Sequence, residues 1–248
     1  MSRRSTLFLA LAVFLAAALP AIAAQPIQHG IDTWRTVPEA TYADFRDNPL
    51  PAGFFCAESP VFSGQIYLHG VPVVTDKGTL NRADTVVERL DDAVFNRRGV
   101  AFTRVQVRAL QLAGIENFKT VCGEYKVFVT LDGGEQPVSR MKIVRDNNLG
   151  GRFMVPLSVN TKIIFVRVDN ESERLEFADP VHFPPNPLNR WSYRELTPNS
   201  KRIGALVVDT DWDGTPDTAL PGQSNFAPGW RNGMNKTTIY EGTHTVEF

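Results

Sequence analysis

Between residues 62 and 177, apolar side chains recur at every second position in a series of short segments. Val105 and Val107 alternate with arginine and glutamine, and every odd position from Phe153 to Val159 is apolar. A period of two is typical of a strand with one buried and one solvated face. Short strands of this kind, separated by turns, predict an antiparallel all-β fold, and we expect a β-sandwich of jelly-roll or immunoglobulin-like type.

Glycine, asparagine and aspartate bound these segments, as at Asp132-Gly133-Gly134. The alternation changes phase at Ala109 and Leu110, which predicts a β-bulge or a change of face. The predicted strands cover residues 62–68, 71–75, 104–108, 125–131, 140–143, 153–159, 162–168 and 175–177.

Residues 84–95 fit two patterns. Val86, Val87, Leu90 and Val94 keep a helical spacing. The run Thr85-Val86-Val87, however, is β-branched, and its neighbours in the chain are predicted strands. We therefore predict a strand here.

The pattern divides the chain into five parts. Residues 1–23 form a signal peptide, and residues 24–60 lack a sustained period and predict an extended N-terminal arm held by scattered aromatic residues. Residues 61–183 form the sandwich core. Residues 184–200 open with Pro184-Pro185-Asn186-Pro187 and predict a rigid connector. Residues 201–248 form a loop-rich C-terminal extension.

The signal peptide is predicted from its composition. Arg3 and Arg4 precede an apolar run over residues 7–19, and Ala21-Ile22-Ala23 has the small residues of a cleavage site. The protein is therefore expected to be exported, to a periplasm or outside the cell, without an integral membrane segment after cleavage. Residues 1–23 hold two of the 26 basic residues and none of the 27 acidic ones, so the remaining chain carries a charge of −3. That charge argues against nucleic acid as a partner.

The chain contains two cysteines, Cys56 and Cys122. In an exported protein an even number of cysteines usually forms disulfides. We expect a structural disulfide between them, rather than two free thiols or a catalytic cysteine.

The residues with the clearest chemical meaning are Asp209-Thr210-Asp211-Trp212-Asp213-Gly214-Thr215-Pro216-Asp217. Calcium takes six to eight oxygen ligands, and carboxylates at alternate positions can converge on one ion if the chain curls. Gly214 allows the sharp turn. The loop resembles the calcium loop of EF-hands and the shorter aspartate-rich loops of thrombospondin type 3 repeats and dockerin modules. The resemblance implies calcium as a cofactor, with ligands from Asp209, Asp211, Asp213, Thr215 and Asp217.

Two positions depart from the EF-hand pattern. Leu220 stands where the EF-hand has a bidentate glutamate, and Pro216 stands where an apolar residue with a free N–H is usual. A further oxygen would come from water, Asn225 or Glu241. The preceding residues read as a strand, so a helix–loop–helix is not expected. The alternative interpretation is a solvated acidic turn that closes a hairpin.

Motifs for catalysis are scarce. The sequence has no H-E-x-x-H, G-x-S-x-G, Walker or dinucleotide-binding motif. Asp84, Glu88, Asp91 and Asp92 could supply a pair of carboxylates for glycoside hydrolysis, although a solvated charged edge explains them equally well.

Three classes of function remain. The first is a non-catalytic exported β-sandwich, stabilised by calcium and a disulfide, with a structural, adhesion, envelope or matrix role. The second is a carbohydrate-binding module that uses Trp191, Trp212 or Trp230. The third is a calcium-dependent extracellular hydrolase. The partner expected for the first two is an extracellular glycan or an envelope component.

Overall fold

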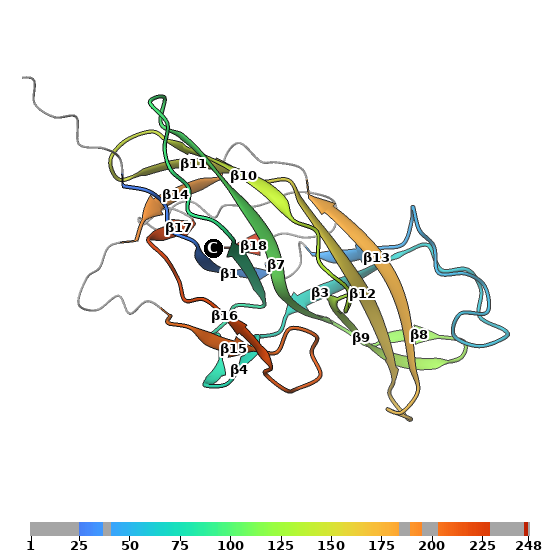
Figure 1. The fold of residues 1–248 in the computed structure, drawn as a ribbon. Coiled ribbons are helices and arrows are strands. Elements are labelled where there is room, and N and C mark those ends of the chain that lie inside the picture. The colour runs from blue at the N-terminus through green and yellow to red at the C-terminus, as the bar shows by residue number, and fades with distance from the viewer. Residues whose placement is uncertain (1–24, 37–40, 184–188, 195–202, 229–245, 248) are drawn as a thin grey trace, which may run out of the picture.

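The computed structural model describes residues 25–36, 41–183, 189–194, 203–228 and 246–247. Throughout this part of the chain the regular structure is β-strand, paired in antiparallel ladders, which confirms the predicted all-β class (Figure 1). In chain order the strands are β1 Gly30–Thr36, β2 Tyr42–Asp44, β3 Gln65–Gly70, β4 Val74–Thr75, β5 Gly78–Thr79, β6 Thr85–Arg89, β7 Val100–Gly114, β8 Phe118–Thr120, β9 Gly123–Leu131, β10 Ser139–Arg145, β11 Gly150–Met154, β12 Leu157–Arg167, β13 Arg174–Phe183, β14 Arg190–Tyr193, β15 Leu206–Val208, β16 Thr218–Leu220, β17 Phe226–Pro228 and β18 Val246–Glu247.

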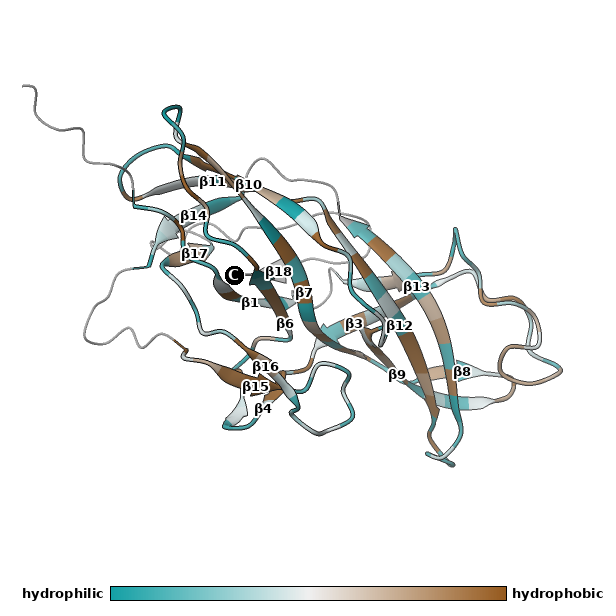
Figure 2. Ribbon diagram, viewed as in Figure 1, coloured by the Kyte–Doolittle hydropathy of each residue, from teal (hydrophilic) through white to brown (hydrophobic). Residues whose placement is uncertain are grey.

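The long strand β7 organises the large sheet, which runs in the order β13-β12-β9-β7-β10-β11-β14-β17. Its first residues pair with β10, its middle residues pair with β6, and its last residues pair with β9 and β3. Figure 1 shows β7 crossing the middle of the molecule between these two groups of strands. Figure 2 shows hydrophobic and hydrophilic residues alternating along β7 and β12, as the period of two predicts.

The predicted bulge is present where β6 pairs with β7. Val86 lies opposite Ala109, whereas Val87 lies opposite Val107, so Arg108 is the extra residue. The change of phase in the sequence therefore located the bulge to within one residue. Residues 85–89 form a strand, as their β-branched side chains indicate.

The boundary between the strands predicted at 153–159 and 162–168 was wrong. The structure ends β11 at Met154 and makes one strand, β12, of residues 157–167. The break lies at Val155-Pro156. Proline has no backbone N–H to donate to a ladder, so it is disfavoured inside a central strand.

Part of the segment predicted as an arm lies within the sheet. β1 pairs with β6 over five residues, Gly30 to Trp34. Its even positions Asp32, Trp34 and Thr36 are all buried. Two of these three are polar, so the period that marks a buried face is hidden in the sequence.

The connector predicted at 184–200 falls mostly outside the described residues. Within it, residues 190–193 form β14, which pairs with β11 and β17. The predicted signal peptide lies wholly outside the described residues. No helix long and apolar enough to cross a membrane occurs in the described part of the chain.

Aromatic rings fill one end of the main core. The Phe55 ring lies 5.1 Å from that of Phe165, and Phe62 lies 4.7 Å from Phe118, both measured between centroids in edge-on pairs. Such pairs contribute about 0.5–1.5 kcal/mol beyond their buried area. The disulfide between Cys56 and Cys122 is formed, as predicted, with its Cα atoms 5.8 Å apart. It joins the loop that carries Phe55 to the turn between β8 and β9.

A second, smaller apolar cluster supports the C-terminal strands. Val208 and Leu220 pack there with Ile31, Val73 and Val86, which come from the first half of the chain. The strands β15 and β16 form a small sheet with β4 and β5. The connection from β15 to β16 is therefore held on a packed base.

A candidate metal-binding loop

The Asp-rich residues 209–217 connect β15 to β16. Val208 lies opposite Thr218 in this hairpin, so the nine residues between them form its loop. Asp209 attaches the loop to β4 and β7, two strands from earlier in the chain. The Asp209 backbone N–H donates to the Val74 backbone oxygen at 3.0 Å. The Gln111 side-chain amide on β7 donates to the Asp209 backbone oxygen at 3.1 Å. The first predicted ligand is thus fixed to the body of the protein.

Three of the predicted ligands converge. Carboxylate oxygens of Asp209, Asp211 and Asp213 all lie within 4.8 Å of one another. Asp209 is fully buried, whereas the other two are exposed. This is the one group of three or more histidine, cysteine, aspartate or glutamate side chains at such distances that the described residues contain.

Backbone N–H groups hold the curl of the loop. The Asp209 carboxylate accepts hydrogen bonds from the backbone N–H groups of Trp212 at 2.7 Å and Gly214 at 3.0 Å. Trp212 has a φ of 64° and Gly214 a φ of 92°, both in the left-handed region. Glycine adopts that region freely, but for Trp212 it is strained. The Trp212 ring packs edge-on against Phe128 of β9, 5.1 Å away, which helps to hold this conformation.

The electrostatics of the loop favour a cation. Burial raises the pKa of Asp209, the N–H groups of Gly214 and Trp212 lower it, and the nearby carboxylates of Asp211 and Asp213 raise it further. Like charges in one site oppose ionisation of all three groups. A divalent cation would relieve this repulsion, and hard oxygen ligands in a flexible loop suit calcium.

The other predicted ligands lie at the edge of the loop. Thr215 is exposed, and its backbone N–H donates to Asp213 at 2.6 Å. Asp217 is also exposed and accepts a hydrogen bond from the Thr218 hydroxyl at 2.9 Å. Leu220, which stands where an EF-hand has its bidentate glutamate, is buried in the smaller apolar cluster. Its position therefore serves packing.

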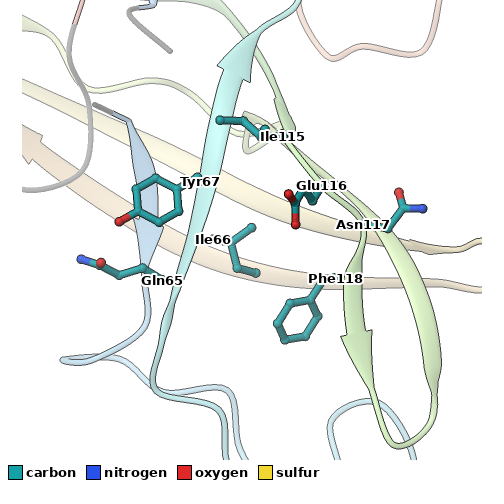
Figure 3. A pocket seen from close by; sticks show the side chains of 7 residues that line it. All are labelled: Gln65, Ile66, Tyr67, Ile115, Glu116, Asn117 and Phe118. Carbon is teal, nitrogen blue, oxygen red and sulfur yellow. The ribbon is translucent and has the colours of Figure 1, made fainter. Parts of the chain in front are cut away.

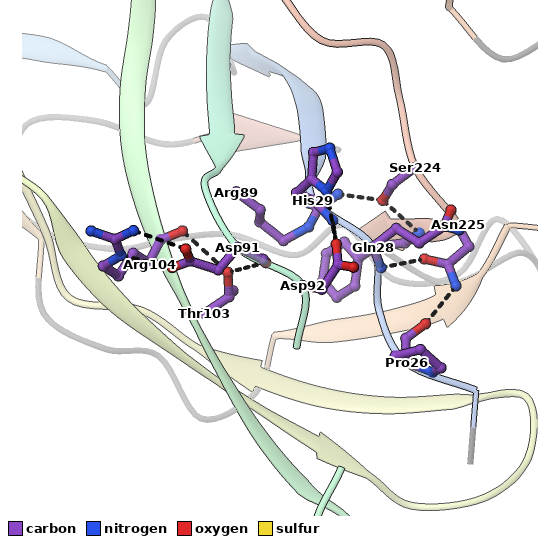
Figure 4. A network of polar contacts seen from close by, with 11 residues as sticks. Pro26, Gln28, His29, Arg89, Asp91, Asp92, Thr103, Arg104, Ser224 and Asn225 are labelled. Carbon is purple, nitrogen blue, oxygen red and sulfur yellow. Dashed lines mark hydrogen bonds and ion pairs between the residues drawn. The ribbon is translucent and has the colours of Figure 1, made fainter. Parts of the chain in front are cut away.

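The Asn225 side chain is engaged outside the loop. Its amide accepts a hydrogen bond from the Gln28 N–H at 2.9 Å and donates one to the Pro26 oxygen at 2.8 Å, so it ties residues 26–28 to the segment before β17 (Figure 4). Both ends of the Asn225 amide are therefore engaged by the N-terminal residues, and the contribution of Asn225 to a calcium site stays a prediction. Glu241 lies outside the described residues.

The tryptophans predicted to contact a ligand have different environments. Trp191 is only 1% exposed and stacks between Phe95 and Phe226, so it belongs to the core and offers no free face. Trp212 is partly exposed within the Asp loop. Trp230 lies outside the described residues.

The carboxylates considered for glycoside hydrolysis are engaged by four different partners. Asp84 is buried beside Thr36. Glu88 pairs with Arg108 at 3.4 Å and Asp91 with Arg104 at 2.7 Å. Asp92 pairs with His29 at 2.8 Å (Figure 4). Each has a separate partner, as in a structural network of charges.

A buried ion pair that was not predicted from the sequence joins β6 to β1. The Arg89 guanidinium binds the Asp32 carboxylate, donates to the Ser224 hydroxyl at 2.6 Å and lies 4.6 Å from the centroid of the Phe226 ring. Arg89 is 0% exposed and Asp32 is 1% exposed. Nothing in the local sequence distinguishes these residues from solvated charges, because the partners come from β1, β6 and the segment before β17.

The buried Asp84 gives the protein a specific pH response. Burial raises the pKa of Asp84 to about 6, against hydrogen bonds from Thr36 and Thr85 that lower it. A carboxyl group whose pKa is higher in the folded state than in the unfolded state binds more protons when folded. The free energy of unfolding should therefore fall as the pH rises from about 4 to about 6, by about 2 kcal/mol from this residue.

Urea unfolding at several pH values, for the wild type and Asp84→Asn, measures this effect. The amide can accept from the Thr36 N–H and donate to the two threonine hydroxyls, so it suits the same position. The wild type should lose stability relative to Asp84→Asn over this pH range. The exposed Glu58→Gln serves as the control. If the free energies of unfolding of the wild type and Asp84→Asn changed with pH in parallel, the raised pKa of Asp84 would be contradicted.

No protein-family model matches this chain, and no curated protein and no solved structure shows significant similarity to it. The function must therefore be inferred from the site itself.

Proposed function

We propose that this protein is an exported, non-catalytic β-protein with a structural, adhesion or envelope role, in which calcium bound by residues 209–217 and the Cys56–Cys122 disulfide stabilise the fold. The observation that carries the proposal is the convergence of the Asp209, Asp211 and Asp213 carboxylates in a curled loop. The order and spacing of these residues match loops that bind calcium.

The residues that would hold the ion fit calcium in chemistry and in number. Asp209, Asp211 and Asp213 supply carboxylate oxygens, and Thr215 and Asp217 follow at the next two ligand positions of the loop. Five ligands leave room for water, which calcium accepts readily in its flexible coordination sphere. The role of the ion would be to hold a loop-rich hairpin against β7 and β9.

Two further features support a non-catalytic exported role. The disulfide suits an oxidising compartment, in line with the predicted signal peptide. The four carboxylates considered for hydrolysis, Asp84, Glu88, Asp91 and Asp92, are each engaged by a different partner, which argues against the hydrolase alternative.

We expect calcium to raise the melting temperature of residues 24–248. At a calcium concentration 100 times the dissociation constant, a ligand specific for the folded state adds about 2.7 kcal/mol to the free energy of unfolding. For a chain of this size the midpoint should rise by roughly 5–10 °C. Asp213→Ala should abolish the response, because it removes one of the converging carboxylates.

Thermal melts in calcium and in EGTA, followed by circular dichroism, test this expectation. Glu58→Ala, which removes an exposed carboxylate elsewhere, should respond to calcium like the wild type. Magnesium at the same concentration should have a smaller effect, since it demands a more rigid octahedral site. Superimposed melts in calcium and EGTA would identify the loop as a solvated acidic turn.

A further inference from the structure

The cavity between β3 and β8 has the features of a binding site. It has a volume of about 460 Å³, and its lining comprises Gln65, Ile66, Tyr67, Ile115, Glu116, Asn117 and Phe118. This volume falls in the range of pockets that bind ligands. Tyr67 is 50% exposed and Ile115 is 46% exposed. Figure 3 shows Ile66, Glu116 and Phe118 in the space between the two strands.

The backbone of β3 presents an unpaired edge to this cavity. Successive residues of a strand direct their N–H and C=O groups to opposite edges. The Leu68 N–H donates to Thr41 on the β2 side, whereas the Tyr67 oxygen accepts from the Ile115 N–H on the other side, at 3.0 Å. The backbone groups of Gln65 therefore face the same side as those of Tyr67. There the ladder with β7 has ended, since it pairs only residues 68–70 of β3.

The other wall of the cavity also has an open edge. β8 pairs with β9 on one side, and no other strand of the described chain pairs with it. β3 and β8 thus diverge after Ile115. The cavity between them, lined by residues 65–67 and 115–118 and called the wedge below, has a strand edge on each side. Lys119, which is exposed on β8, limits how far an added strand could extend.

The long edge strand β13 shows how this protein protects an edge that should stay free. β13 pairs only with β12 among the described strands, and it carries Pro180 and the charged Glu176 and Asp179. Proline and charges prevent the addition of another strand. The wedge instead presents the exposed Ile115, beside the partly buried Phe118 and the buried Ile66.

The charge at the wedge selects a basic partner. Glu116 lines the cavity, and the neighbouring Glu124 accepts a hydrogen bond from Asn117 at 2.9 Å. Neither glutamate forms an ion pair within the described residues. A lysine or arginine on a bound segment would complement this negative charge.

We infer that the wedge between β3 and β8 binds an extended peptide segment of a partner protein, with alternating apolar side chains and a flanking basic residue. Added strands gain affinity from main-chain hydrogen bonds and specificity from pockets for alternate side chains. The inference rests on the proposed non-catalytic role and names the partner's chemistry. It does not depend on calcium, because the wedge shares no residue with the Asp loop.

The test is a selection of random dodecapeptides by mRNA display against residues 24–248. We expect an enriched family with apolar residues at alternate positions and a lysine or arginine at one end. The affinity of its best member, measured by fluorescence anisotropy, should fall at least tenfold for Ile115→Lys and about threefold for Glu116→Gln. N-methylation of alternate amides in the peptide should weaken binding in both registers, because successive amides of the bound segment would face the edges of β3 and β8.

Controls separate the possible outcomes. Leu149→Lys, at a residue 75% exposed in the β10–β11 turn, should bind like the wild type. The inference fails if no family is enriched, if the family binds Ile115→Lys equally well, or if N-methylation in either register has no effect. It also fails if labelled cellohexaose binds in place of peptides, or if sedimentation shows that the wedge joins two copies of the chain. Calcium melts of the same samples show separately whether the proposed ion site fails.

Discussion

Replacement of Arg89 by methionine is expected to lower the free energy of unfolding by about 3–5 kcal/mol, because it leaves the Asp32 carboxylate buried without its partner. Burial raises the pKa of Asp32, and the charges of Arg89 and Arg194 pull it down. Without Arg89 the carboxyl group should take up a proton more readily. The loss should therefore be smaller at pH 5 than at pH 8.

The double variant Asp32→Leu/Arg89→Met removes both charges. Buried ion pairs replaced by apolar side chains of similar size are often as stable as the original, or more stable. We expect this variant to recover most of the stability lost in Arg89→Met, with urea unfolding as the measurement. Arg104→Met, which breaks the exposed pair with Asp91, is the matched control and should cost less than about 1 kcal/mol. Equal losses in the buried single and double variants would show that the pair contributes through packing alone.

Removal of the disulfide by Cys56→Ala/Cys122→Ala is expected to lower the free energy of unfolding by about 4 kcal/mol. The bond closes a loop of 66 residues, and the chain-entropy estimate for such a loop has this size. The bond also holds Phe55, which directly precedes Cys56, and the loop carries Phe62 and Phe118 into the aromatic end of the core, so the variant should lose order there first.

Denaturant unfolding of the oxidised wild type, the reduced wild type and the double variant measures this contribution. The reduced protein and the variant should unfold at the same midpoint, both below the oxidised protein. A difference of less than about 1 kcal/mol between the oxidised protein and the variant would show that the unfolded chain keeps residues 56 and 122 close together, since a disulfide acts largely on the unfolded state.

The sequence determined the features that depend on short stretches of chain. The period of two at residues 104–108 and 125–131 identified strands, because alternate side chains of a strand face opposite sides. The change of phase near Ala109 identified the bulge. The spacing of Asp209, Asp211 and Asp213 predicted that their side chains converge, because a short curled loop brings alternate residues to one centre.

The tertiary structure alone decided which distant residues meet. β1 was hidden because its buried face carries Asp32 and Thr36, and these are stable there only with partners from distant parts of the chain, Arg89 and Asp84. The wedge beside β3 exists because the ladder between β3 and β7 ends and β3 and β8 diverge after Ile115, and no local pattern encodes that divergence. Trp191 could be recognised as a core residue only after Phe95 and Phe226 were seen on either side of it, since a tryptophan on a surface and one in a core look alike in sequence.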